Sequence, residues 1–351
     1  FFMALGALIG TFEEIVVLVP LTIGLAISLG WDSLTGLGMS LLAAGFGFAA
    51  AISNPFTVGV AQRLAGLPAF SGIAYRVLIF LIVYVLLLWF LVSYAKKVEK
   101  SPEDSLVYNE DQTLRVKYAT EQVVSDKDEP HLRSAIRIFS LFLLLILAVI
   151  VAGFFVEAIS AISLPLVAIV FTVGAICAGV LSKYASAKGV VLDLLKGMTG
   201  ILPAILLILM AMSVKHIMVA GKTMDTVLQW AADRVGGMSP YMAGLSIYIL
   251  ILFLELFISS GSAKAFLVIP IVAPLVDIIG LTRQSAVLAF TFGDGFSNVF
   301  FPTNAVLMIA LGLTTVSFVK WLKWTVKIQL AIFVITILML FGAIAFGYGP
   351  Y

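Results

Sequence analysis

The sequence has 351 residues, of which 62% are hydrophobic and 11% are charged, and its formal net charge is +2. A soluble domain carries about 25% charged residues, so this composition excludes an ordinary soluble protein and predicts an all-α polytopic membrane protein. Nothing in the charge pattern suggests a nucleic-acid partner, and one cysteine with two histidines is too few for a zinc cluster.

Residues 1–95 are predicted to form a first membrane repeat. The sequence begins inside an apolar segment, so we expect this repeat to be N-terminally incomplete. Its predicted parts are a small apolar stretch 1–14, an apolar limb 15–30, a run 34–64 that breaks at 53–57, and a spanning helix 73–94 of the roughly 20 residues that a bilayer needs.

Residues 96–134 are the longest hydrophilic stretch and are predicted to be a linker between two membrane parts. Lysine and arginine recur in this linker, and short loops rich in these residues face the cytoplasm. The linker is therefore predicted to be cytoplasmic.

Residues 135–351 are predicted to form a second membrane repeat. The count of membrane crossings agrees with the charges of the loops only if one segment enters and leaves on the same side. The predicted parts are spans near 135–157, 164–182 and 199–220, an interface helix at 222–237, a re-entrant hairpin at about 241–280, a broken helix at about 285–313, and a last span at 325–347.

An internal repeat relates the two parts at a shift of 250 residues without a gap. The matched pairs are Pro20 with Pro270, Gly30 with Gly280, Gly45-Phe46 with Gly295-Phe296, and Asn54 with Asn304. The loop charges place the two hairpins on opposite sides. The predicted fold is therefore an inverted-topology repeat, each half with a re-entrant hairpin and a broken transmembrane helix, as is usual in secondary transporters.

Polar residues at the helix breaks are the first set of candidate site residues. They offer neutral oxygens that suit a small cation or a substrate, although they also suit the backbone groups that Pro55 and Pro302 leave free. As substrate ligands we consider Ser53, Asn54, Thr303 and Asn304; as ion-coupling residues we consider Asn54, Thr57, Asp294, Ser297, Asn298 and Asn304.

The hairpin tips supply the second set. Ser260, Gly261 and Ser262 begin a helical limb, whose free N–H groups can hold a carboxylate. Glu13 and Glu14 occupy the other tip.

Charged residues near the tips leave two interpretations open. Glu14 and Lys264 share a repeat position and either form an ion pair or bind the ammonium and the carboxylate of a substrate. Glu255 lies nearer a predicted membrane edge, where we expect it to snorkel or to pair.

Three motifs carry a resemblance to a known family. They are Gly10-Thr-Phe-Glu-Glu-Ile, Ala51-Ile-Ser-Asn-Pro-Phe-Thr-Val-Gly-Val-Ala-Gln and Gly293-Asp-Gly-Phe-Ser-Asn-Val-Phe-Phe-Pro-Thr-Asn. With them the whole chain resembles the YfcC family of bacterial inner-membrane carriers, grouped with the four-carbon dicarboxylate anaerobic carriers. The resemblance implies a mobile domain of two hairpins and two unwound helices, and a scaffold that forms a homodimer. The Ser-Asn-Thr tips of related sodium symporters are absent here.

The functional prediction is a secondary active transporter for a small carboxylate-bearing metabolite, working by elevator-type alternating access. Glu13 and Glu14 favour an amino acid, with exchange of basic amino acids as one form and a sodium- or proton-coupled dicarboxylate transporter as the alternative. A channel or an intramembrane protease fits less well, since no charge ring, Ser–His pair or zinc motif is present. No enzyme activity and no cofactor beyond a sodium ion or proton are expected, and the expected location is a bacterial inner membrane.

Overall fold

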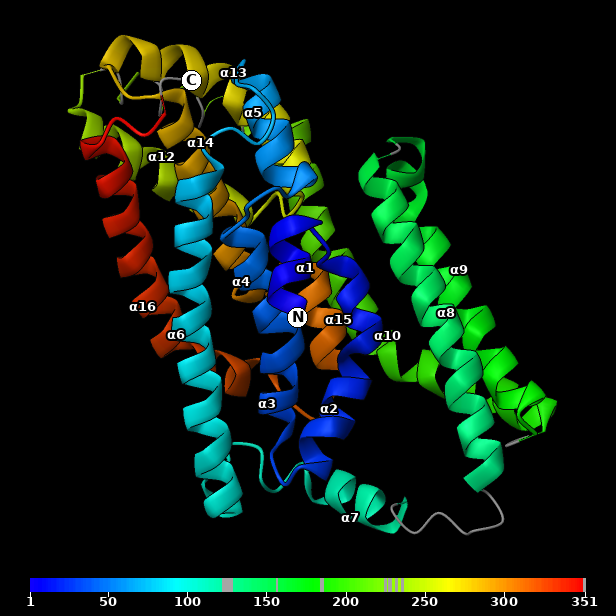
Figure 1. The fold of residues 1–351 in the computed structure, drawn as a ribbon. Coiled ribbons are helices and arrows are strands. Elements are labelled where there is room, and N and C mark those ends of the chain that lie inside the picture. The colour runs from blue at the N-terminus through cyan, green and yellow to red at the C-terminus, as the bar shows by residue number, and fades with distance from the viewer. Residues whose placement is uncertain are drawn as a thin grey trace.

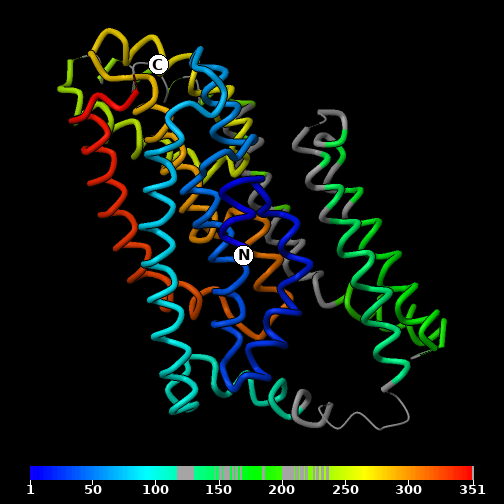
Figure 2. Tube along the Cα trace, viewed as in Figure 1, coloured from blue at the N-terminus to red at the C-terminus, as the bar shows by residue number. Residues whose placement is uncertain are grey.

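The computed structural model describes residues 1–121, 129–155, 157–183, 186–223 and 237–349, with isolated positions between 226 and 234. These residues form helices and connecting loops and no strand, which confirms the all-α prediction. Among them, Ile73–Lys100, Gly261–Ile279 and Phe318–Ala345 are long and apolar enough to cross a membrane. Figure 1 shows α7 at one end of the molecule and the C-terminus at the other, while the N-terminus lies midway between them (Figure 2).

Short helical pieces dominate the first 72 residues, and one long helix follows them. The pieces are α1 (Phe2–Leu8), η1 (Glu13–Leu18), α2 (Val19–Ser28), α3 (Ser33–Leu37), η2 (Gly38–Leu42), α4 (Ala43–Ala49), η3 (Pro55–Gly59) and α5 (Val60–Leu64), and the long helix is α6 (Ile73–Lys100). The observed break spans residues 50–54, so it begins before the predicted break at 53–57, and residues 55–57 already belong to η3. Pro55, the first residue of η3, cannot donate a backbone hydrogen bond.

The hydrophilic stretch after α6 contains η4 (Pro102–Asp104) and α7 (Gln112–Glu121). Its residues 105–111 return to the helices rather than lying free. Asp111 accepts hydrogen bonds from the backbone N–H and hydroxyl of Ser33 and from the hydroxyl of Thr315. This stretch therefore joins the turn before α3 to the loop before the last helix.

The second part of the chain has longer helices and one internal interruption. The helices are α8 (Glu129–Phe155), α9 (Glu157–Leu181), α10 (Ala187–Ala220), α12 (Pro240–Glu255), α13 (Gly261–Ile279), α14 (Arg283–Gly295), η5 (Phe296–Val299), α15 (Ala305–Gly312) and α16 (Phe318–Ala345). Half of the residues of the predicted interface helix 222–237 lie outside the described residues. The predicted broken helix at about 285–313 is helical from Arg283 through Val299, as α14 and η5, and its break lies at residues 300–304, before α15.

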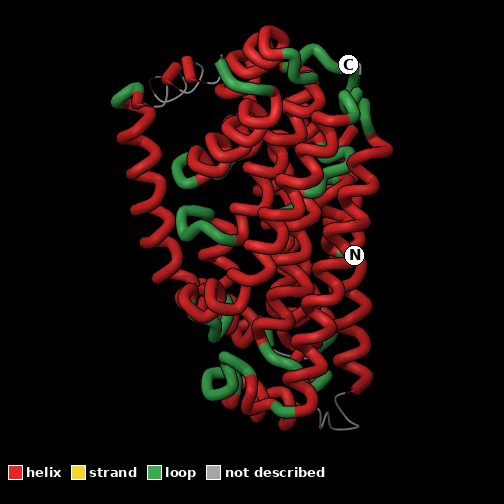
Figure 3. Tube along the Cα trace, turned by 90° about the vertical axis from the view of Figure 1, so that its left-hand side faces the viewer, coloured by secondary structure: helices red, strands yellow, loops and turns green. Residues whose placement is uncertain are grey.

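The long helix α6 has one buried face and one apolar exposed face, a contrast that a bilayer allows. On α6, Ile79, Val83 and Leu87 are buried at a spacing of four residues, while Val85 and Trp89 are more than 60% exposed. The spacing of four places the buried residues on one side of the helix. Figure 3 shows that loops occur halfway along the molecule as well as at its ends.

Matching turns follow α2 and α13. Gly30 and Gly280 both have φ near +80°, a conformation that costs glycine little. In each turn the N–H of the next residue bonds to the carbonyl five positions before it. The side chains of Asp32 and Thr282 then cap the following helix. These features recur 250 residues apart.

Close approach of α4 to the end of α14 depends on two glycines. A Cβ atom on Gly295 would lie 2.2 Å from the Cα atom of Ala49, and a Cβ atom on Gly45 would lie 2.4 Å from Cγ1 of Val299. These distances are far below ordinary carbon contacts, so only glycine allows the two interrupted helices to approach this closely.

Candidate functional site

A cavity of about 300 Å³ lies where two chain reversals meet inside the molecule. We call residues 9–14 the first tip and residues 256–262 the second tip. The lining residues come from both tips and from the interrupted helices: Gly10, Phe12, Glu13, Glu14, Phe48, Phe56, Ser259, Ser260, Gly261, Ser262, Asn298, Asn304, Ala305 and Val306. The cavity thus brings together predicted site residues that are more than 240 positions apart in the sequence.

The first tip supplies the acidic wall. Gly10 has φ +80°, and a Cβ atom there would lie 2.4 Å from Oδ1 of Asn54, so the tip can turn this tightly only with glycine. The turn leads into η1, which starts with Glu13 and Glu14. Glu13 is exposed, and both residues line the cavity, so the wall carries two carboxylates.

The second tip supplies a helix N-terminus. Ser260 is the N-cap of α13, and its hydroxyl accepts a hydrogen bond from the N–H of Ala263. Gly261 and Ser262, the first two residues of the helix, line the cavity. Backbone N–H groups in the first turn of a helix have no partner within the helix and favour negative charge. The two walls therefore differ in electrostatic character.

Asparagines mark both interruptions and act there as helix caps. Asn54 Oδ1 accepts hydrogen bonds from the N–H groups of Phe56 and Thr57, and Asn304 Oδ1 accepts one from Leu307. Asn304 also donates to Oδ1 of Asn298 at 2.7 Å, and these two amides line the cavity together. At both interruptions the asparagine side chains thus hydrogen-bond to free backbone groups, which is one of the two roles that the sequence analysis considered for them.

Other predicted site residues lie around the cavity without lining it. Ser53 donates its hydroxyl to the carbonyl of Leu8, and Ser297 donates to the carbonyl of Gly293. Thr57 and Thr303 each have a buried hydroxyl oxygen that has no hydrogen-bond partner among the described residues.

Lys264 lies behind the second tip rather than on the cavity wall. Its Nζ contacts Glu255 and lies 2.9 Å from Oδ1 of Asp294, and the side chains of all three residues are fully buried. Lys264 therefore pairs with these two acids rather than with Glu14. Of the two expectations for Glu255, snorkelling at a membrane edge or pairing, the structure shows pairing, because Glu255 is fully buried against Lys264.

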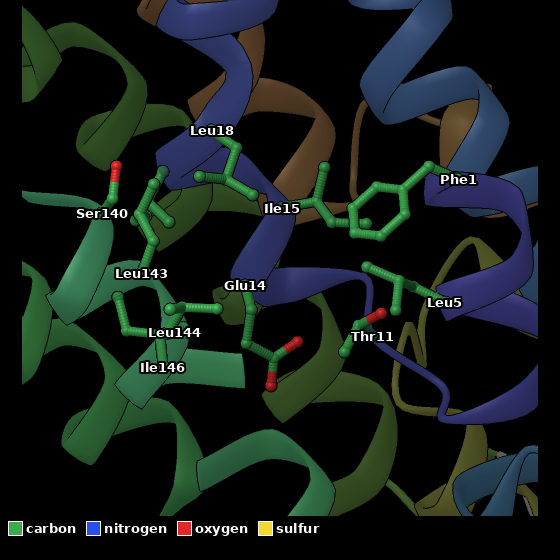
Figure 4. Close-up of a pocket in the computed structure, with 11 residues that line it drawn as sticks. Phe1, Leu5, Thr11, Glu14, Ile15, Leu18, Ser140, Leu143, Leu144 and Ile146 are labelled. Atoms are coloured by element: carbon green, nitrogen blue, oxygen red, sulfur yellow. The ribbon is translucent and has the colours of Figure 1, made fainter. Parts of the chain in front are cut away.

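A second cavity, of about 410 Å³, lies between the first tip and α8. Figure 4 shows leucine and isoleucine side chains along its walls, with the Glu14 carboxylate beside Thr11. Glu14 Oε2 and Thr11 Oγ1 are buried and lack hydrogen-bond partners among the described residues. Since Glu14 lines both cavities, its carboxylate separates an apolar space from the polar one.

Glu255, Phe48 and Phe56 were missed as candidates by the sequence reasoning. The signal for Glu255 was present, since a carboxylate at the end of an apolar run, nine residues before a lysine, suggests a pair within the membrane. Phe48 and Phe56 flank a helix break, but apolar residues are so common in this chain that they carried no signal.

Comparison with known proteins gives the family. The family model described as "C4-dicarboxylate anaerobic carrier" (DcuC) matches residues 1–345. A protein of Escherichia coli (strain K12) named "Putative basic amino acid antiporter YfcC" is 30% identical over 98% of this chain and 68% of its own length. An uncharacterized protein of Haemophilus influenzae (strain ATCC 51907 / DSM 11121 / KW20 / Rd) is 26% identical over 91% of this chain and 61% of its own length.

No solved structure matches the chain. The family match covers nearly all of its residues, and the apolar helices agree with a multi-pass membrane protein. The chain belongs to the C4-dicarboxylate anaerobic carrier family and is a transporter.

Proposed function

We propose that this protein is a secondary active transporter of a small carboxylate-bearing metabolite, with a basic amino acid as the favoured substrate. One observation carries the proposal: the cavity between the tips has Glu13 and Glu14 on one wall and the N-terminus of α13 on the other. A basic amino acid has a carboxylate for the helix N-terminus and a cationic side chain for the two glutamates.

Charge favours this substrate over a dicarboxylate. Two carboxylates line the cavity, whereas Lys264, behind the second tip, does not line it and already contacts two acids. A dianion would therefore meet like charge without a free cation to offset it. The name of the Escherichia coli relative agrees with an amino-acid substrate, and the name of the family keeps coupled dicarboxylate transport as the second candidate.

Alternating access by an elevator movement is part of the proposal. We divide the chain into repeats at 1–95 and 135–351 joined by a cytoplasmic linker at 96–134, with re-entrant hairpins at the two tips. The matching turns at Gly30 and Gly280, and the edge-to-face ring pair of Phe46 with Phe296 at 5.3 Å, support an inverted repeat with the site between its halves.

The proposal also includes the membrane in which the carrier lies and its oligomeric state. Both similar proteins come from bacteria, which supports a bacterial inner membrane. The helices outside the tips and interrupted helices would form the scaffold, and we propose that it forms a homodimer.

A thermal-shift screen of the purified protein tests the substrate. Ligands that bind the native state raise the apparent midpoint of unfolding. We expect L-arginine, L-lysine or L-ornithine to raise it, and succinate or fumarate to have no effect with or without sodium. Stabilisation by succinate alone, in the presence of sodium, would instead support dicarboxylate symport.

Matched variants assign the effect to the cavity. Glu13→Gln and Glu14→Gln should each raise the apparent dissociation constant for L-arginine by about tenfold or more, since each removes a charge-assisted contact. This constant is read from the arginine concentration that raises the unfolding midpoint. Glu103→Gln, at an exposed position in η4, is the control and should respond as the unchanged protein does. Equal responses from all three variants would exclude the acidic wall as the cation site.

A further inference from the structure

Three charged side chains meet behind the second tip, one from each of three helices. Glu255 ends α12, Lys264 lies in the first turns of α13, and Asp294 lies near the end of α14. Their side chains have no solvent exposure. We call these three residues the buried triad.

The charges of the buried triad do not balance. Two carboxylates and one ammonium leave an excess negative charge when all three groups are ionised. Glu255 Oε1 and Asp294 Oδ2 are buried, and neither has a hydrogen-bond partner among the described residues. An uncompensated buried charge is unfavourable, and one proton on either carboxyl removes it.

A proton fits this place better than a metal ion does. Lys264 Nζ already contacts both carboxyl groups, so a second cation between them would lie against an ammonium. A proton needs no additional space and no ligand shell. The described residues also contain no group of three or more histidine, cysteine or acidic side chains arranged to hold a metal ion.

The buried triad and the cavity share a thin wall. Gly261 lines the cavity, and a Cβ atom built on it would lie 2.8 Å from Asp294 Oδ2 and 2.9 Å from Cγ2 of Thr57. The Asp294 carboxylate thus lies directly against the glycine of the second tip. Glu13, from the first tip, lines the same cavity as Gly261.

We propose that the buried triad is a proton-binding site that is coupled to the cavity across Gly261. It holds one exchangeable proton on Glu255 or Asp294. A cationic substrate at Glu13 and Glu14 adds positive charge near Asp294 and displaces the proton to water, so proton and substrate cation exchange one for one. The inference about exchange rests on the proposed carrier function.

Infrared difference spectroscopy of the protein at stepped pH tests the proton site without any substrate. A protonated carboxyl group has a carbonyl stretching band that disappears when the proton leaves. We expect such a band in the unchanged protein and its loss in both Glu255→Gln and Asp294→Asn, because each variant leaves Lys264 with one carboxylate and no excess charge for a proton to remove. Loss in one variant alone would still support the proton site, with the proton fixed on the replaced residue.

The variants are chosen so that the protein should fold. Each leaves Lys264 with one carboxylate, which is a neutral pair. Asp277→Asn, on the same helix as Lys264 but in a surface pair with Arg283, is the control and should keep the band. Lys264→Gln leaves both carboxyl groups without their cation and should strengthen the band.

Two results would overturn the proton site: a band that persists in both Glu255→Gln and Asp294→Asn, or no titrating band in the unchanged protein. Proton release on adding L-arginine, followed with a pH indicator in weak buffer, then tests the coupling. Release that is lost in Asp294→Asn supports exchange. Arginine binding without release, with the band intact, would refute the coupling and leave the carrier function standing, whereas absence of arginine binding would refute the proposed substrate alone.

Discussion

Substitution of Gly45 tests the close contact between the two interrupted helices. A Cβ atom at this position would lie 2.4 Å from Val299 Cγ1, about 1 Å closer than an ordinary carbon contact. Val299 is fully buried and β-branched, so its side chain has little freedom to turn away. Gly45→Ala should therefore destabilise the protein by about 2 kcal/mol, within the range of overpacked cores.

Val299→Ala is the matched rescue. It removes Cγ1 and leaves Cβ at 3.5 Å from the new methyl group, which is an ordinary contact. Alone it should cost about 2 kcal/mol of lost apolar burial. The double variant should be more stable than the sum of the two single changes predicts, by roughly 1 to 2 kcal/mol, because the clash no longer exists.

The assay is the apparent unfolding midpoint in detergent at a fixed scan rate, followed by tryptophan fluorescence. Trp321 donates its indole N–H to the carbonyl of Val299 and so reports on this contact. For a chain of 351 residues, about 2 kcal/mol corresponds to a lowering of roughly 3 °C. Gly197→Ala is the control and should not lower the midpoint, because a Cβ atom there would have no atom from elsewhere in the described part of the chain within 4 Å.

The contact at Gly295 should behave differently. Its Cβ atom would meet the backbone of Ala49, whose Cα would be 2.2 Å away, and Ala49→Gly does not remove that atom. Gly295→Ala should thus cost about 3 kcal/mol or more, without rescue. Additive effects at Gly45 and Val299, or rescue at Gly295 by Ala49→Gly, would contradict the close helix contact.

Two further predictions concern the segment after α6. Asp111→Asn replaces a fully buried carboxylate that accepts bonds from Ser33 and Thr315, so it should destabilise the protein by about 2 kcal/mol in the same assay. The Lys320 ammonium, which donates to Glu110, holds the pKa of that carboxyl below its usual value of 4.5. A lowered folded-state pKa gives stability that is present above the unfolded-state pKa and is lost as pH falls through the folded-state value. The difference in unfolding midpoint between the unchanged protein and Glu110→Gln should therefore vanish in acid. It should be small at neutral pH, because the pair is partly exposed.

Glu103→Gln is the control for both changes, since it lies in the same segment and is exposed. A midpoint for Asp111→Asn equal to that of Glu103→Gln would show that the buried hydrogen bonds do not hold the segment in place. If the difference in unfolding midpoint between the unchanged protein and Glu110→Gln grew as the pH fell, the predicted pH dependence would be wrong.

The parts of the fold that could be predicted from the sequence are those where glycine, proline or asparagine ends or starts a helix. Gly280 ends α13 in the left-handed conformation, and Pro55 opens the helix after the first break, as their chemistry requires. Asn54 and Asn304 were recognised at the breaks for the same reason. Such signals are local, so a single sequence displays them.

Partners across the fold could not be predicted in this way. From the sequence alone, Glu14, Glu255 and Asp294 could each pair with Lys264. The packing of α12, α13 and α14 brings Glu255 and Asp294, but not Glu14, into contact with it. The contacts of residues 105–111 with the helices could not be predicted from composition either, because a polar, charged stretch is typical of a solvated linker. Its burial depends on hydrogen bonds to Ser33 and Thr315, which lie far away in the sequence.

The position of Asp111 between the two parts has a consequence for biogenesis. Its partner Ser33 is synthesised before it, but Thr315 follows 204 residues later. At about 5 to 20 residues per second, a ribosome needs roughly 10 to 40 s to supply that residue. For this interval Asp111 can accept its hydrogen bonds from Ser33 but not the one from Thr315, so the first part must tolerate an unfinished state in the membrane while the helices that complete it are still being made.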